Sequence, residues 1–524
     1  MKRISTLLAI SVFLAGATLG AVPRKPKLIL TIVIDQFRYD YLTRFRSDYK
    51  GGLARLLDQG AVFTSAYYEH FPPVTAVGHS TVLSGATPSI SGIVANEWLD
   101  RESGKEISSV SDGAVKLLGG KIGDPAASPH RLLVTTVSDQ LKMANHNQTK
   151  AIGVSIKDRS AILPVGRMAN GAFWFDAATG NFVSSTYYFE SLPPWAAKYN
   201  ASRAVDKFLG KGWLPFDAKP SANAYTILPT QPGKTFYDAL ERTPYGNQVI
   251  EQFAEAALDG EQLGRGPATD VLSVSFSSND RIGHTLGPDD PQIRDIAIQT
   301  DRIIGQLIHF AESRAGAGNV LVVLTADHGV SPVPAVSAQN HISAGFIKPA
   351  LITTTLQSSL SAKYGDGDWV QMKKGYEIIY LDHSVIARKK LNEADVQRTA
   401  ADALRMLPHV ARVYTRSQLL RNELLDDMID HRVRNGFHVA RSADLFVILD
   451  PFYLFQNEAT GTSHTSPYNY DTHVPVVFMG PGIRAGRYNG RIAVNDIAPT
   501  LTNMLDIEVP NGSVGRVLDE ILER

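Results

Sequence analysis

Carboxylate and imidazole side chains that could bind metal ions follow three separate hydrophobic runs of this chain. These side chains are Asp35, Asp280, His284, Asp327 and His328. Cysteine is absent, so any metal site must use oxygen and imidazole nitrogen, a mixture that Zn²⁺ accepts. A lone Asp-x-x-x-His is more often a hydrogen-bonded pair on a helix. Asp327-His328 is a stronger signal, because an unpaired carboxylate after a buried strand costs several kcal/mol. With one further histidine, the set could hold two ions about 4 Å apart, as in two-metal hydrolytic sites.

The stretch 70–85 contains a candidate nucleophile, Thr75. Pro72 and Pro73 favour an extended lead-in, and the pattern after them predicts a short helix that Gly85 ends. Thr75 is then expected at or near the helix N-cap, where backbone N–H groups and the helix dipole stabilise an anion. A threonine at this place is usually only a cap. As a nucleophile its hydroxyl would need a base or a metal ion, and the acids and histidines elsewhere in the chain favour that role.

Two cations, Lys157 and Arg159, follow the hydrophobic run 151–156. If this segment is extended, their side chains point the same way, because alternate residues of a strand share a face. Two cations presented together match the non-bridging oxygens of a phosphoryl group, and arginine can bind them in bidentate fashion. The other interpretation is a solvated, charged turn after a strand.

Most of these groups stand at the ends of runs that have the composition of buried strands. The predicted strands cover residues 27–34, 61–68, 151–156, 271–276, 320–325 and 474–479. Helical patterns such as residues 290–311 separate them, which indicates an α/β fold with a mainly parallel sheet. Ligands of such sheets bind beyond the carboxyl ends of the strands, so one site could collect all these groups.

The chain has 524 residues, of which 52 are basic and 52 acidic. This balance leaves no net field to attract nucleic acid or anionic lipid, and it favours a small-molecule substrate over a nucleic-acid partner. Residues 1–21 have the basic start, apolar run and small residues of a secretory signal peptide. No other segment approaches the length of a membrane span. We therefore expect a periplasmic or secreted protein with no membrane span after signal removal.

In their order along the chain, these motifs resemble those of the alkaline phosphatase superfamily. The motifs are Asp35, the Thr75 loop with its Phe-Pro-Pro lead-in, Asp280-x-x-x-His284, Thr325-Ala326-Asp327-His328-Gly329 and the late His464. Within the superfamily the chain looks most like the single-chain, zinc-dependent bacterial periplasmic alkaline phosphatases related to the type I phosphodiesterase/nucleotide pyrophosphatases. The resemblance implies a central, mostly parallel sheet flanked by helices, with cap insertions over a site for two Zn²⁺ ions.

The resemblance also implies which residues hold the two ions. The ligands of the first would be Asp35, Thr75, Asp327 and His328. The ligands of the second would be Asp280, His284 and a third histidine. His464 resembles the motif that carries this ligand in phosphodiesterase relatives, whereas His473 could serve in a differently arranged loop. His79 has no assigned role.

Groups beyond the metal ligands distinguish the branches of the superfamily. In the monoesterase branch, a lysine and an arginine two residues apart bind the phosphoryl oxygens together with an asparagine after the nucleophile helix. Lys157, Arg159 and Asn96 match that pattern, which implies hydrolysis of phosphate monoesters through a phospho-threonine at Thr75. One alternative is a phosphodiesterase or nucleotide pyrophosphatase with the same bimetallic site. Another is an exported metal- or phosphate-binding protein without turnover.

The order of the motifs also predicts a domain organisation. Residues 22–341 would form the core, with an inserted cap region at about 160–260 that includes the aromatic stretch 171–190. The alternative for this stretch is the core itself, since aromatic residues at such density are more often simply core. Residues 342–449 separate the Asp327-His328 motif from His464, and their pattern is that of an accessory α+β insertion. Residues 450–524 would return to the core.

Overall fold

The computed structural model describes residues 25–219, 223–371 and 377–523. The expected signal peptide, residues 1–21, lies outside this range. Within it, no helix is both long enough and apolar enough to cross a lipid bilayer.

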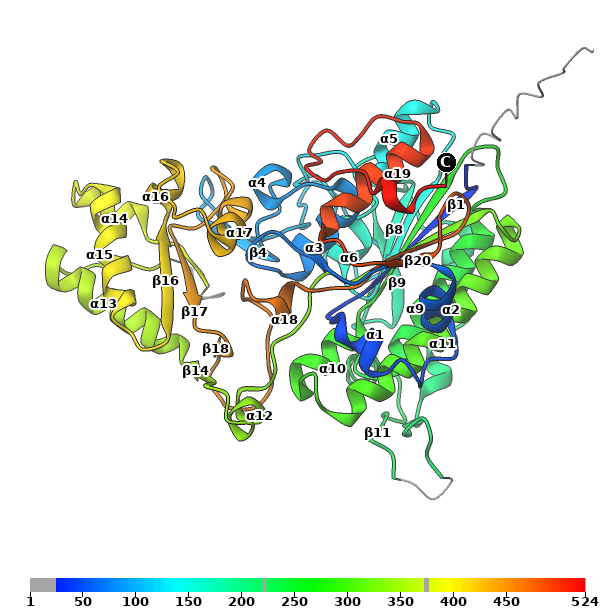
Figure 1. Ribbon diagram of the computed structural model, residues 1–524, viewed down its shortest axis with the longest axis horizontal. Coiled ribbons are helices and arrows are strands. Elements are labelled where there is room, and N and C mark those ends of the chain that lie inside the picture. Colours follow the sequence, from blue (N-terminus) through cyan, green and yellow to red (C-terminus); the bar gives the residue numbers. More distant parts are fainter. Residues whose placement is uncertain (1–24, 220–222, 372–376, 524) are drawn as a thin grey trace, which may run out of the picture.

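A ten-stranded sheet forms the centre of the molecule (Figure 1). Its order is β20-β2-β19-β13-β1-β12-β7-β8-β9-β6. The middle strand, β1 (Leu28–Ile34), pairs in parallel with β12 (Asp270–Phe276) and β13 (Val320–Thr325), and every residue of the three strands is buried. Such mainly apolar runs form strands because both faces of the sheet are covered. The other strands are β2 (Ala61–Phe63), β6 (Leu117–Leu118), β7 (Ala151–Ser155), β8 (Gly171–Asp176), β9 (Asn181–Ser185), β19 (Val476–Met479) and β20 (Gly486–Tyr488).

The strand directions and the helices confirm the predicted fold class, a mostly parallel sheet flanked by helices. Strands β13, β1, β12, β7 and β8 run in parallel, whereas β19 and β9 run the opposite way. Helices α2, α9 and α11 pack together on one side of the sheet, and α3, α5, α6 and α19 lie on the other (Figure 1). The bounds are α2 (Gly52–Gln59), α3 (Thr75–Ser84), α5 (Val137–Ala144), α6 (Asp158–Ile162), α9 (Pro244–Gly260), α11 (Pro291–Ala315) and α19 (Ile497–Leu505).

The prediction of one strand over residues 61–68 is wrong. This run forms β2 in the central sheet and then β3 (Ala66–Tyr67), which pairs with β21 (Ile492–Ala493) in a separate small sheet. The backbone changes partner at Thr64, whose N–H donates to Tyr488 O at 2.9 Å. The hydrophobic pattern is continuous across this change, which is why the sequence indicates one strand.

The aromatic stretch 171–190, expected in a cap, instead supplies β8 and β9 of the central sheet. Phe173 and Phe182 are fully buried in the main core. The ring of Phe182 stacks on that of Phe253 in α9, with centroids 3.8 Å apart. These aromatics therefore cover a face of the sheet, and this part of the expected cap region at 160–260 is core.

A smaller α+β unit follows β13 along the chain and occupies the left of Figure 1. Its three-stranded sheet has the order β15-β17-β16, and α15 packs against both β16 and α13. The unit has its own hydrophobic cluster, which includes the fully buried Leu356, Trp369 and Leu404. Strand β14 pairs with β18 where the chain enters and leaves the unit. The bounds are α13 (Pro349–Tyr364), α15 (Glu393–Arg405), β14 (Gly345–Ile347), β15 (Ile378–Ile379), β16 (Val410–Thr415), β17 (Leu445–Leu449) and β18 (Tyr453–Phe455).

Candidate active site

The carboxyl ends of four neighbouring strands bring the predicted side chains together. Asp35 directly follows β1, Asp327 closely follows β13, and Lys157 closely follows β7. Asp280 lies in the first turn of α10 (Ser278–Leu286), which begins just after β12. Because these strands are parallel neighbours, their ends lie at the same edge of the sheet.

Two compact groups of acidic and imidazole side chains form at this edge. In each group, the potential ligand atoms lie within 4.8 Å of one another. The Asp280 group is Asp280, His284 and His464, and the Asp327 group is Asp35, His79 and Asp327. Asp280 Oδ1 lies 3.2 Å from His284 Nε2 and 3.8 Å from His464 Nε2. His328 connects the groups, because its Nε2 is 3.1 Å from Asp327 Oδ2 and its ring stacks on His464 with centroids 3.4 Å apart.

The two histidines considered as a third partner of Asp280 lie in different places. His464 belongs to the Asp280 group, and its Nδ1 is 3.0 Å from Pro73 O, which leaves Nε2 facing the group. His473 has its Nε2 3.1 Å from a backbone carbonyl, and its ring stacks on two tyrosines. The geometry therefore favours His464 over His473 as a ligand.

Thr75 is the first residue of α3, and the N-cap is Val74 rather than Thr75. The Thr75 side chain makes no capping hydrogen bond. Its Oγ1 lies 3.4 Å from Lys157 Nζ and 3.5 Å from His328 Nε2. The hydroxyl is therefore free of a capping role and faces both a cation and an imidazole.

Lys157 is the N-cap of α6 and Arg159 lies in the first turn of this helix, so the condition of one extended segment for both residues is not met. The Lys157 Nζ lies 2.9 Å from Asp35 Oδ2 and 2.6 Å from Asp280 Oδ2. Burial lowers the pKa of Lys157, but the Asp280 and Asp35 carboxylates outweigh burial and raise the pKa above its usual value. The lysine therefore stays charged beside the Thr75 hydroxyl.

The other two predicted phosphate-binding residues lie near this lysine and this hydroxyl. Arg159 is in the first turn of α6, and its positive charge repels that of Lys157 and so lowers the pKa of the lysine. The Arg159 Nε is buried and donates to no described residue. Asn96 Oδ1 accepts a hydrogen bond from the Ala76 N–H at 2.8 Å, which places the Asn96 amide next to Thr75.

The carboxylates of the site fit the binding of divalent cations. Asp35, Asp280 and Asp327 are at most 4 % exposed, and Lys157 lies among them. The Asp327 Oδ2 is buried and accepts no hydrogen bond from any described residue. Burial and the nearby Asp35 carboxylate raise the pKa of Asp327 to about 8, so one ammonium group does not neutralise the cluster. Buried carboxylates in such excess either take up a proton or pair with a cation, and a metal ion would take the place of the proton on Asp327.

Two of the candidate imidazole ligands, those of His328 and His464, have the protonation state that metal binding requires. The third, His284, differs, because burial lowers its pKa but the Asp280 carboxylate outweighs burial and raises it above the usual value. Burial lowers the pKa of His328 to about 3. Burial, together with the neighbouring His328 and His284, also lowers the pKa of His464. Both rings are therefore neutral near pH 7, the form in which imidazole binds metal ions. Neutral imidazole and carboxylate oxygen together are a donor set that suits zinc.

Besides Ser275, two residues that contact the site were not predicted from the sequence. His79 lies one turn after Thr75, with Nδ1 2.9 Å from Thr75 O and Nε2 2.9 Å from Ser275 Oγ, which donates to Asp35 Oδ1 at 2.7 Å. The four-residue spacing from Thr75 places both on one face of α3 and could have indicated this role. Gln36, directly after Asp35, is the second such residue.

Helix α17 (Met428–Gly436) of the smaller unit also reaches the site. Arg432 O accepts a hydrogen bond at 3.0 Å from the N–H of Phe71, four residues before Thr75. The fully buried Arg432 guanidinium donates to Pro467 O. One helix therefore contacts both the loop that leads to Thr75 and the loop that carries His464.

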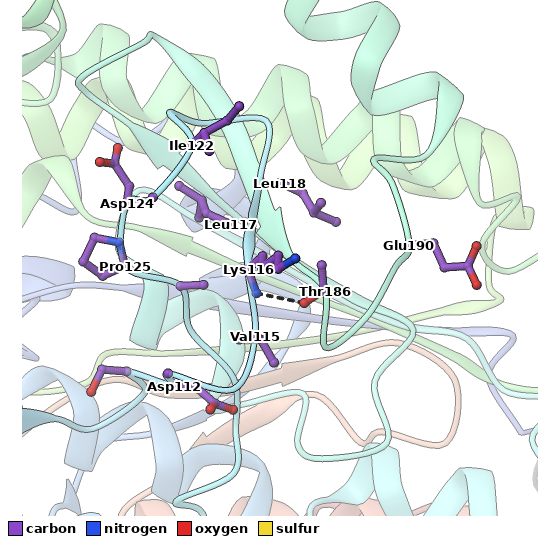
Figure 2. Close-up of a pocket in the computed structure, with 14 residues that line it drawn as sticks. Asp112, Val115, Lys116, Leu117, Leu118, Ile122, Asp124, Pro125, Thr186 and Glu190 are labelled. Atoms are coloured by element: carbon purple, nitrogen blue, oxygen red, sulfur yellow. Dashed lines mark hydrogen bonds between the residues drawn. The ribbon is translucent and has the colours of Figure 1, made fainter.

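A separate cavity of about 790 Å³ lies beside β6 and the end of β9 (Figure 2). Its walls come mainly from the loop 111–126, together with Thr186 and Glu190. The Thr186 Oγ1 accepts a hydrogen bond from the Lys116 N–H at 2.8 Å, which ties the loop to the segment after β9. None of the candidate site residues described above lines this cavity.

Comparison with known proteins assigns the chain to a family. The profile described as type I phosphodiesterase/nucleotide pyrophosphatase matches residues 29–475. Alkaline phosphatase PafA of Elizabethkingia meningoseptica is 34 % identical over 547 residues, which cover 100 % of this chain and 99 % of that protein. Alkaline phosphatase PhoV of Synechococcus elongatus is 34 % identical, over 95 % of this chain and 93 % of that protein. A crystal structure of wild type PafA matches with a TM-score of 0.88 at 33 % identity, covering 95 % of this chain and 99 % of that chain. The chain therefore belongs to the type I phosphodiesterase/nucleotide pyrophosphatase family of the alkaline phosphatase superfamily.

Proposed function

We propose that this protein is an alkaline phosphatase, a zinc-dependent hydrolase of small-molecule phosphate monoesters that acts through a phospho-threonine at Thr75. Relatives that match nearly the whole chain bear the name alkaline phosphatase. The observation that carries the proposal is the position of Thr75 Oγ1. It lies 3.4 Å from Lys157 Nζ, at the strand ends that also hold the Asp280 group and the Asp327 group.

Two Zn²⁺ ions fit the donor groups of this site. The ligands of one ion would be Asp35, Thr75, Asp327 and His328, and those of the other Asp280, His284 and His464. When bound, such ions supply Lewis acidity that lowers the pKa of a hydroxyl group and positive charge that neutralises phosphoryl oxygens. The excess of buried carboxylates and the neutral rings of His328 and His464 support this assignment.

Thr75 Oγ is the nucleophile of the proposed reaction. A bond from Oγ to phosphorus forms as the ester P–O bond breaks, and the alcohol leaves with a proton. Water then cleaves the bond between Thr75 and phosphorus and releases inorganic phosphate. Lys157, Arg159 and Asn96 hold the non-bridging oxygens while the charge on them changes. The Asp280 and Asp35 carboxylates outweigh burial and raise the pKa of Lys157, which supports a charged ammonium group in this role.

The preference for monoesters follows from the two cations. A monoester presents more anionic oxygen than a diester, and a diester needs room for its second ester group, which Lys157 and Arg159 would restrict. The test is kcat/KM for an aryl phosphate monoester and for the matching diester, on zinc-loaded and chelator-stripped protein. We expect a large, zinc-dependent preference for the monoester. A diester preference would refute the role of the two cations, and activity that survives chelation would refute the role of zinc.

Export and domain organisation complete the proposal. The basic start and apolar run of residues 1–21 support secretion into the periplasm or out of the cell. We expect the core to comprise residues 22–341 and 450–524, with residues 342–449 as an accessory insertion. The separate hydrophobic cluster of the smaller unit supports this division. Recovery of activity with the periplasmic fraction, and its loss from that fraction after removal of residues 2–21, would test the export.

A further inference from the structure

Gln36 has an unusual backbone conformation for a residue that is not glycine. It follows Asp35 at the end of β1, its φ is 58°, and it is 2 % exposed. A residue with a side chain adopts this left-handed region at a free-energy cost, and such residues occur often at functional sites. The surrounding structure therefore has to hold Gln36 in place.

The hydrogen bonds of Gln36 reach both groups of candidate metal ligands. Its backbone N–H donates to Asp327 Oδ1 at 3.0 Å. Its side-chain Nε2 donates to Asp280 Oδ1 at 2.9 Å, which leaves Asp280 Oδ2 to face Lys157 at 2.6 Å. One residue thus contacts one carboxylate of the Asp327 group and one of the Asp280 group.

The helix that carries Asp280 leaves room for this side chain. Gly283 lies between Asp280 and His284 on α10, and a Cβ at Gly283 would stand 1.8 Å from Gln36 Oε1. Any residue other than glycine would therefore push the Gln36 side chain away. The close approach of α10 to Gln36 thus depends on Gly283, because it is the one position between Asp280 and His284 that has no side chain.

We propose that Gln36 is a positioning residue that orients the carboxylates of both metal groups, Asp280 through its side-chain amide and Asp327 through its backbone N–H. The proposal rests on the two-zinc site of the proposed function. Partners of this kind restrict the orientation of a ligand before the ion binds, and their loss typically costs about tenfold to hundredfold in metal affinity.

The test measures the affinity of the whole protein for Zn²⁺ by competition with a chromogenic chelator. Gln36→Gly removes the amide but keeps the left-handed backbone, and Gln36→Glu keeps the shape but turns a carboxylate oxygen towards Asp280. Gly283→Ala displaces the Gln36 side chain without changing it. Gln262→Gly is the matched control, because Gln262 is exposed and has a φ of 54° but does not contact the site.

We expect each of the three site variants to bind one of its two zinc ions about tenfold to hundredfold more weakly, with the other ion less affected. The control should bind both ions as the wild type does. The Tm of each zinc-free variant shows that it is folded at the assay temperature, and excess zinc should restore much of kcat in the site variants. Unchanged zinc affinity in the site variants, or an equal loss in the control, would overturn the proposal.

The same experiment separates this inference from the proposed function. A wild-type protein that binds no zinc, or that binds zinc but hydrolyses no monoester, would refute the proposed function. A wild-type protein that binds two ions and hydrolyses monoesters, together with site variants that bind both ions equally well, would refute only the role of Gln36.

Discussion

Replacing Gly436 by alanine would push α17 away from the loop that leads to Thr75. A Cβ at Gly436 would lie 1.8 Å from Phe71 O, whereas ordinary contacts of a Cβ begin at 3.4 Å. Phe71 O is a backbone atom and an alanine Cβ is fixed to the backbone, so no change of rotamer can relieve this clash. The hydrogen bond from the Phe71 N–H to Arg432 O, at 3.0 Å, joins the same two segments. We therefore expect Phe71 and α17 to separate by more than an ångström.

The size of the effect on activity follows from this displacement. A shift of about 1 Å in a reacting group can cost ~10²-fold in rate, which corresponds to ~2.7 kcal/mol of transition-state stabilisation. Because Phe71 is four residues before Thr75, we expect a loss of kcat/KM of this order. Helix propensity acts in the opposite direction, since alanine is more favourable than glycine in a helix by roughly 1 kcal/mol. A loss of activity in Gly436→Ala would therefore not be caused by a less stable α17.

The assay is kcat/KM for an aryl phosphate monoester, with Tm and zinc content measured on the same preparation. Gly113→Ala is the control, because a Cβ at Gly113 would meet no atom within 4 Å and its φ is not left-handed. We expect Gly436→Ala to lose activity while it keeps its zinc, and Gly113→Ala to keep both. A folded Gly436→Ala protein with wild-type kcat/KM would show that α17 does not position Thr75.

Two further changes test other parts of the site, and a third tests Asp471, a fully buried carboxyl group in α18 (Asn469–Thr472). Thr75→Ala should abolish turnover while both zinc ions remain bound, and loss of zinc together with activity would contradict the nucleophile assignment. Replacement of both Lys157 and Arg159 by uncharged residues should reduce kcat/KM far more for a monoester than for a diester, whereas equal losses would contradict their role. Burial raises the pKa of Asp471 from 3.8 to about 8. The stability that this carboxyl contributes is therefore full below pH 3.8 and is lost as the pH rises through about 8. The side chain of Asp471→Asn does not titrate in this range, so the stability of the variant lacks this pH dependence. From pH 6 to pH 9 the Tm of the wild type should therefore fall relative to that of the variant. A constant difference in Tm would argue against the raised pKa.

The fold and much of the candidate site were predictable because they depend on local patterns. A buried parallel strand is apolar along its length, so a hydrophobic run in the sequence indicates the strand, and the first polar residue after the run indicates its end. Asp35, Asp327 and Lys157 were found in this way. Their meeting at one edge then follows from the parallel direction of the strands.

Other features could not be predicted because they depend on contacts between distant segments. The hydrogen bond from Gln36 to Asp280 exists only because β12 pairs with β1 and α10 starts at the end of β12. The composition of the aromatic stretch 171–190 suits either a cap or a core, and the pairing of β8 with β7 places the stretch in the core. Whether Lys157 and Arg159 share an extended segment was left open by the sequence, and the structure shows that they do not, because α6 begins directly after Lys157.

The sequence by itself determined the chemistry that is available to this protein. Residue types and their places after apolar runs specify carboxylate, imidazole, hydroxyl and cationic groups at the strand ends, and a chain without cysteine restricts any metal ligands to oxygen and nitrogen. Only the tertiary structure decided which groups meet. It places His464 rather than His473 beside Asp280, and it brings α17 against the loop before Thr75. The reason is that hydrophobic periodicity encodes which face of an element is buried, whereas the partner of that face is selected by packing along the whole chain.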